Sequence, residues 1–285
     1  MEKKDLNSWE VCDINEQINY FSPNQFAAQE IRQSEIVLND FSSLQKSHYG
    51  INEVYSCKKY MTPIRVQSIE NFAIFGNKDL LENACQLSNE ITYIDGNHLN
   101  DALFTTYSAI ARTTAGYAKK AMCIEVPSTL NATSSYFLTH ELTHALKERN
   151  PLECTNLFTT AEVIPILIEL ITAYESNNKK IIENVFSKRK DLIISTIDFY
   201  KNHHLKNPAP YTISGCYINS FYYALSLFSL YLKYPDTILL TLQNVLNCQL
   251  TTDALLKILL ESSEKENFDE EYQTGKEVFM LQLKN

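Results

Sequence analysis

The run His-Glu-x-x-His at residues 140–144 has the spacing of a metal-binding helix. Residues four apart lie on the same helix face, so the imidazoles of His140 and His144 can converge on one ion, while Glu141 projects toward water in an open coordination position. The variable positions from 139 to 146 are uncharged, which suits a helix inside a domain, and Asn150-Pro151 ends it. The run predicts one Zn²⁺ per chain.

A catalytic zinc usually has three protein ligands, so a third must come from another element. Glu162 and Glu169 are seven residues apart within an apolar stretch, and both therefore lie on nearly the same helix face. An unpaired carboxylate would be costly there, and metal ligation would offset that cost. We favour Glu162 as the ligand and Glu169 as an acceptor that orients a histidine. The opposite assignment stays open, and Glu153 is a remote candidate.

Long helices should position these residues, because six glycines and eight prolines are few for 285 residues. The pattern predicts a mainly α fold in one domain, 1–285, with an N-terminal helical part, a catalytic core and a C-terminal segment at 1–110, 111–262 and 263–285. Helices are expected at 23–46, 78–91, 98–114, 160–176, 178–203, 211–233, 236–248 and 251–262. Residues 51–76 are expected to be irregular.

Two smaller features complete the expected fold. Residues 121–126 read as a short strand just before the metal helix, stopped by Pro127. As an edge strand it would pair with an extended peptide, although an isolated segment without a ligand is an open alternative. The acidic residues 264–271 are expected to be a solvated surface, followed by a last helix or strand.

Composition excludes several classes of protein. A formal charge of −9 disfavours nucleic acid as a partner, and the basic run 188–190 is expected to be a solvated helix face. The apolar stretch 221–232 is too short to span a membrane and predicts a buried helix. Seven dispersed cysteines without a Cys-x-x-Cys pair indicate free, mostly buried thiols. A polar N-terminus without an export signal favours the cytoplasm.

Residues 112–262 resemble the zinc oligopeptidases of the thimet-oligopeptidase and oligoendopeptidase F group. The resemblance rests on the metal helix, on Glu162 with Pro165 and Glu169 after it, on the tyrosine-rich run 217–223, and on the basic, glycine-containing run 112–117. It implies a helical, zincin-like fold of the gluzincin kind and peptide substrates. The family normally has glycine where this chain has Thr143, and its interval to the third ligand is longer.

The resemblance also implies a mechanism in which Glu141 takes a proton from zinc-activated water and passes it to the leaving amine. A tyrosine of the cluster would stabilise the oxyanion, with Tyr217 as first choice and Tyr222 or Tyr223 next. Two alternatives stay open. One is a regulatory zinc protease that cuts a single partner protein, and the other is a non-catalytic zinc-binding module.

Overall fold

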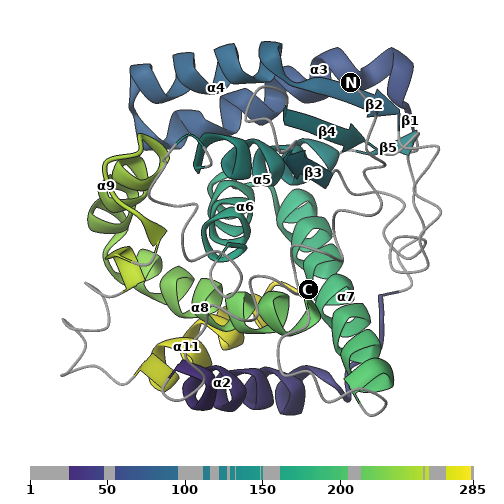
Figure 1. Ribbon diagram of the computed structural model, residues 1–285, viewed down its shortest axis with the longest axis vertical. Coiled ribbons are helices and arrows are strands. Elements are labelled where there is room, and N and C mark those ends of the chain that lie inside the picture. The colour runs from purple at the N-terminus through teal and green to yellow at the C-terminus, as the bar shows by residue number, and fades with distance from the viewer. Residues whose placement is uncertain are drawn as a thin grey trace, which may run out of the picture.

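Helices make up most of the described chain, which confirms the mainly α fold (Figure 1). The computed structural model describes residues 26–47, 55–95, 112–115, 122–126, 129–131, 133–147, 149, 161–204, 213–252, 254–256 and 268–283. Its elements are α2 (Phe26–Phe41), β1 (Tyr55–Ser56), α3 (Cys57–Glu70), η2 (Asn71–Phe75), α4 (Lys78–Glu90), β2 (Thr92–Asp95), β3 (Arg112–Ala115), β4 (Met122–Val126), β5 (Thr129–Leu130), α5 (Ser134–Lys147), α6 (Val163–Glu175), α7 (Lys179–His204), α8 (Ile213–Lys233), α9 (Pro235–Leu246) and α11 (Phe268–Leu281).

Helix α8 is the centre of the packing, because it contacts α2, α6, α7, α9 and α11. Its side chains from Ile218 to Tyr231 are almost all buried, as predicted for the apolar stretch of this helix. Helix α11 approaches α8 closely at Gly275, where a Cβ atom would clash with the backbone carbonyl of Leu225. Within the described residues, no helix is both long and apolar enough to cross a membrane.

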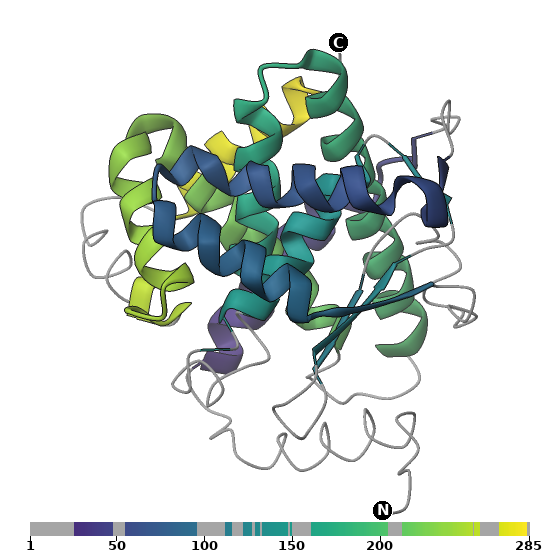
Figure 2. The same cartoon turned by 90° about the horizontal axis from the view of Figure 1, so that it is seen from above.

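Helix α5, which carries the His-Glu-x-x-His run, is held between two layers (Figures 1 and 2). It packs against α6 on one side and against α3 and α4 on the other. The side-chain amide of Asn71 donates to the hydroxyl of Thr139 at 2.9 Å, and that hydroxyl lies 3.0 Å from the carbonyl oxygen of Ser68. These buried hydrogen bonds fix the turn of α5 next to His140 onto α3 and η2.

A small mixed sheet lies beside α5, in the strand order β2-β4-β3. Strand β4 pairs in parallel with β2, where Ile94 is opposite Glu125, and antiparallel with β3, where Thr113 is opposite Ile124. The strand expected at 121–126 is therefore present, but its expected edge position is wrong, because both of its sides are paired. Among the described strands of this sheet, β2 and β3 form the edges.

Some sequence-based boundaries are also wrong. Residues 55–75 form β1, α3 and η2 rather than irregular structure, although Pro63 lies inside α3. The helix expected at 98–114 falls mostly outside the described residues, and its described end, 112–114, belongs to strand β3. Helix α2 ends at Phe41, five residues before the expected end at Lys46.

The C-terminal segment ends in a helix, α11, and part of its acidic run is buried. Glu271 is only 4% exposed; it accepts a hydrogen bond from Ser229 at 2.6 Å and is paired with Lys233. The expectation of a solvated surface is thus wrong for this residue, because its carboxylate faces α8. The described thiols, Cys85, Cys123 and Cys248, are free as predicted, but none of the three is fully buried.

Candidate metal centre

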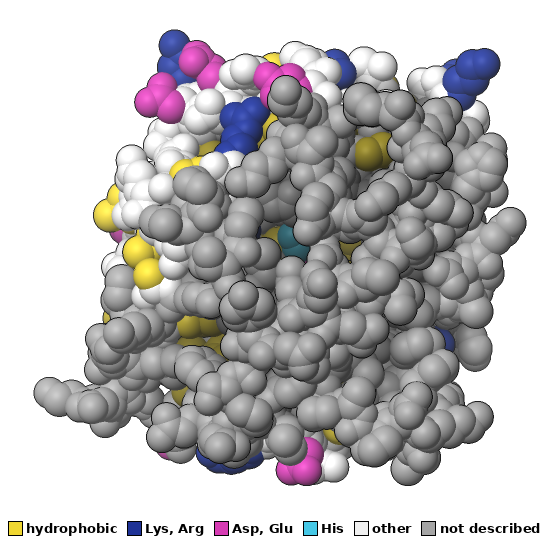
Figure 3. Space-filling view, viewed as in Figure 1, with side chains coloured by type: hydrophobic (Ala, Val, Ile, Leu, Met, Phe, Trp, Pro, Cys, Tyr) yellow, Lys and Arg dark blue, Asp and Glu magenta, His cyan; other side chains and the backbone are white. Residues whose placement is uncertain are grey.

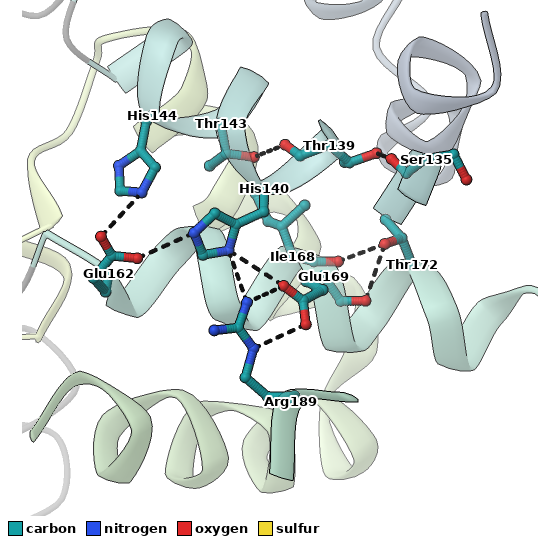
Figure 4. Close-up of polar contacts among 10 residues, drawn as sticks. All are labelled: Ser135, Thr139, His140, Thr143, His144, Glu162, Ile168, Glu169, Thr172 and Arg189. Atoms are coloured by element: carbon teal, nitrogen blue, oxygen red, sulfur yellow. Dashed lines mark hydrogen bonds and ion pairs between the residues drawn. The ribbon is translucent and has the colours of Figure 1, made fainter. Parts of the chain in front are cut away.

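Two segments far apart in the sequence bring three potential metal ligands together (Figure 4). Nε2 of His140 lies 3.1 Å from one carboxylate oxygen of Glu162, and Nε2 of His144 lies 3.2 Å from the other. One ligand atom from each of the three residues lies within 4.8 Å of the others. This group, which is buried or nearly so, could hold a metal ion.

The local structure explains why these side chains converge. His140 and His144 are one turn apart on α5, and their rings meet edge to face with centroids 5.0 Å apart. Glu162 immediately precedes α6, which packs against α5. The ammonium group of Lys147, at the end of α5, donates to the carbonyl of Ala161 at 3.2 Å and so holds the start of α6 near the histidines.

Glu169, one of the two alternative ligands, faces His140 from a different side. One of its carboxylate oxygens lies 3.3 Å from Nδ1 of His140. The same carboxylate is paired with Arg189 of α7, whose Nε donates to the other oxygen at 2.9 Å (Figure 4). Glu169 is fully buried and Arg189 is 4% exposed. The structure therefore brings Glu162 close to Nε2 of both histidines, whereas Glu169 contacts only Nδ1 of His140.

Protonation of the metal-free site follows from these contacts. Burial alone would lower the pKa of His140, but hydrogen bonds to Glu162 and Glu169 and the charge of Glu162 raise it to about 9. Burial likewise opposes ionisation of Glu162, yet the neighbouring His144 and His140 hold the pKa of Glu162 well below its usual range. At neutral pH the metal-free site therefore pairs a protonated His140 with an ionised Glu162, and a metal ion would have to displace that proton.

Tyr217 reaches the site from α8. Burial, the negative charges of Glu162 and Glu141, and a hydrogen bond to Glu162 raise the pKa of Tyr217 well above its usual range. Its hydroxyl therefore stays protonated at neutral pH and remains a donor. Glu141 is buried on α5 and lies close enough to Tyr217 to act on it electrostatically. The predicted base and the first-choice tyrosine thus lie in the same place.

The other two candidate tyrosines lie elsewhere. The Tyr222 hydroxyl donates to Asp269 of α11, and its ring stacks on Tyr272 with centroids 4.6 Å apart. Tyr223 packs against Phe268 at 5.9 Å. A helix turns by about 100° per residue, so Tyr222 and Tyr223, five and six residues after Tyr217, point in directions roughly 140° and 240° around the helix axis from that of Tyr217. The structure therefore does not bring these two hydroxyls to the metal site.

Sequence reasoning missed Arg189. The basic run 188–190 was expected to be a solvated helix face, and this is wrong for its middle residue. The signal was present at helical spacing, because Val185 and Ile193, four residues before and after Arg189, are both buried. An arginine on an otherwise apolar helix face needs an acidic partner in the core, and Glu169 is that partner. Glu153, the remote candidate, lies outside the described residues.

The donor set suits zinc. Two imidazole nitrogens and one carboxylate oxygen, with a further position left for water, form one of the common catalytic ligand sets of Zn²⁺. In a tetrahedral site with bonds of about 2.0–2.1 Å, neighbouring ligand atoms are about 3.3 Å apart. Nε2 of His140 and Nε2 of His144 lie 3.1 and 3.2 Å from the two different oxygens of Glu162, so each histidine nitrogen is close to that separation from one carboxylate oxygen. The group could therefore hold a metal ion, and its ligand types are among those that Zn²⁺ takes.

The two histidines are not wholly shut off from the outside. In Figure 3 a histidine side chain is visible near the centre of the face that is drawn. His140 and His144 are the only histidines whose side chains the structure describes, with side-chain exposures of 7% and 16%. At least one of the two imidazoles is therefore reached from outside.

The chain matches no protein-family model, no curated protein and no solved structure at a significant level. Its function is therefore inferred from the chemistry of the site.

Proposed function

We propose that this protein is a zinc-dependent metallopeptidase with a helical, zincin-like fold of the gluzincin kind. The observation that carries the proposal is the convergence of His140, His144 and Glu162 beside Glu141. A purely structural zinc site has four protein ligands and needs no base. Here three ligands leave a position open, and a buried carboxylate and a tyrosine hydroxyl lie next to it.

Each residue has a distinct role in this proposal. His140, His144 and Glu162 hold the ion, which when bound would polarise the peptide carbonyl and acidify a water molecule. Glu141 accepts the proton of that water and delivers it to the amine of the leaving peptide. Tyr217 donates a hydrogen bond to the oxygen that becomes negative during attack, which requires a protonated hydroxyl at neutral pH. Its raised pKa supports that role.

Peptides are the substrates that best fit the surroundings of the site. Strand β3 contacts α5, and in the described part of the sheet it is an edge strand. An edge strand offers backbone donors and acceptors to an extended chain without requiring particular side chains. The formal charge of −9 also makes nucleic acid an improbable substrate.

The test combines metal analysis of the purified protein with cleavage of a mixed peptide library. We expect one zinc per chain, and cleavage that is lost in Glu141→Gln while zinc is retained. The matched control is Glu82→Gln, the same chemical change at an exposed position of α4. Zinc without cleavage of short peptides, but with cleavage of one partner protein, would favour the regulatory protease. Zinc without any hydrolysis would favour the non-catalytic module, and no zinc would refute the proposal.

A further inference from the structure

The ion pair between Glu169 and Arg189 is unusual in its position, because both charges are removed from water inside the core. The side chains of the two residues are 0% and 5% exposed, and the guanidinium lies over the Phe137 ring at 5.9 Å. Burying such a pair often adds no stability over well-packed apolar residues, because desolvation offsets the attraction. Its position directly behind His140 points to a role in the metal site.

Two groups meet at one oxygen of Glu169. Oε2 of Glu169 accepts a hydrogen bond from a terminal nitrogen of Arg189 and also lies 3.3 Å from Nδ1 of His140. The arginine nitrogen and Nδ1 are themselves 3.3 Å apart. An arginine nitrogen can only donate. Nδ1 would accept from this nitrogen if it were unprotonated, and would converge with it on Oε2 of Glu169 as a second donor if it carried a proton.

The direction of this contact decides which nitrogen is free for a metal. Nε2 of His140 is the nitrogen that faces Glu162, so a neutral imidazole that binds metal through Nε2 must carry its proton on Nδ1. That proton needs an acceptor, and Glu169 is the acceptor in contact. The carboxylate thereby selects the tautomer of His140 and fixes the rotation of its ring.

We propose that Arg189 is a positioning residue of the metal centre, which acts on His140 through Glu169. The planar fork of the guanidinium contacts both oxygens of Glu169 and so fixes the plane of the carboxylate, which a single ammonium group could not do. The inference rests on the metal site of the proposed function, but it does not depend on peptide cleavage.

Zinc affinity of the full chain, measured by competition with a chelator, tests this role. The double variant Arg189→Met with Glu169→Gln removes both charges and avoids an unpaired one. We expect it to bind zinc about 10–100-fold more weakly, which is the usual effect of losing a partner behind a ligand. The conservative variant Arg189→Lys should show a smaller loss. The matched control is Lys233→Met with Glu271→Gln, which removes another pair whose carboxylate is buried, although Lys233 itself is 43% exposed, and should leave zinc affinity unchanged.

A second measurement keeps the inference falsifiable if the variants fold poorly. In the zinc-loaded wild type, the imidazole NMR signals of His140 should show a proton on Nδ1 and none on Nε2. The opposite tautomer, or equal zinc affinity of the wild type and the double variant, would overturn the role of Arg189. A wild type that binds no zinc would instead refute the proposed metal site, and a wild type that binds zinc without cleaving peptides would refute only the peptidase.

Discussion

Two threonines on α5, both fully buried, allow a matched test of how the metal helix is anchored. Thr139 is bonded to other elements as well as to its own helix: its hydroxyl accepts from Asn71 and lies 3.0 Å from the Ser68 carbonyl and 2.8 Å from the Ser135 carbonyl of α5. Thr143, one turn later, donates at 2.8 Å to the backbone carbonyl of residue 139 in its own helix. Valine has nearly the same shape as threonine without the hydroxyl. The same substitution should therefore have different costs at the two positions.

The cost of Thr139→Val can be worked out from the groups left without a partner. Asn71 is 8% exposed, so its amide would lose an acceptor inside the core, which costs about 1–3 kcal/mol, together with the bond that Thr139 donates. We expect a total loss of about 2–3 kcal/mol. Thr143→Val removes only a local bond to a helix carbonyl, and the added apolar surface offsets it, so the change should stay within about 0.5 kcal/mol.

Urea denaturation of the metal-free protein, followed by circular dichroism, measures both changes. Thermal unfolding gives a second estimate. For 285 residues the unfolding entropy is about 0.6 kcal/mol/K, so a loss of 2–3 kcal/mol lowers Tm by about 3–5 °C. Equal effects of the two substitutions would refute the assignment of Thr139 as the anchor between α5 and α3, as would a Thr139→Val protein of unchanged stability.

Three further predictions follow from the structure. Tyr217→Phe should lower kcat on a cleaved peptide by about 10²–10³-fold. The control Tyr222→Phe should leave kcat near the wild-type value. Equal kcat values of the two variants would exclude Tyr217 as the oxyanion donor. Zinc binding should release protons at pH 7 and should strengthen as pH rises toward 9, because the pKa of His140 in the metal-free site is about 9. Calorimetry in buffers of different ionisation enthalpy measures the number of protons released. A zinc affinity that does not depend on pH would contradict the prediction. Gly275→Ala should lower the free energy of unfolding by about 3 kcal/mol, because the added methyl group clashes with α8. Gly76→Ala, which lies in open space at φ +60°, should lower it by only about 1 kcal/mol. Urea denaturation measures both values, and similar losses would count against the close approach of α11 to α8.

Local spacing made part of the metal site predictable. The four-residue interval between His140 and His144 and the apolar surroundings of Glu162 follow from helix geometry and from the cost of burying a charge. The choice among the tyrosines was less accessible, because the sequence does not say which face of α8 points at the metal helix. Only the packing of α8 against α6 and α7 selects Tyr217.

Features fixed by distant contacts escaped prediction. Arg189 looks like a surface residue in a basic run, and its partner Glu169 is twenty positions away on another helix. Helix α3 was missed because Pro63 lies inside it and tertiary packing overrides the weak local preference. Strand β4 was found, but its place in the middle of the sheet depends on pairing with residues 92–95 and 112–115, which no local pattern reveals.

The contact between Lys147 and Ala161 has a consequence for how such sites evolve. It joins the end of one ligand-bearing helix to the residue just before Glu162, so the two ends of the intervening chain are fixed to each other. Lengthening a closed loop costs little, about 0.6 kcal/mol for each doubling. Insertions and deletions between the second histidine and the third ligand can therefore accumulate without moving the ligand. Sites of this kind are better recognised by the arrangement of their ligands in space than by a fixed interval in sequence.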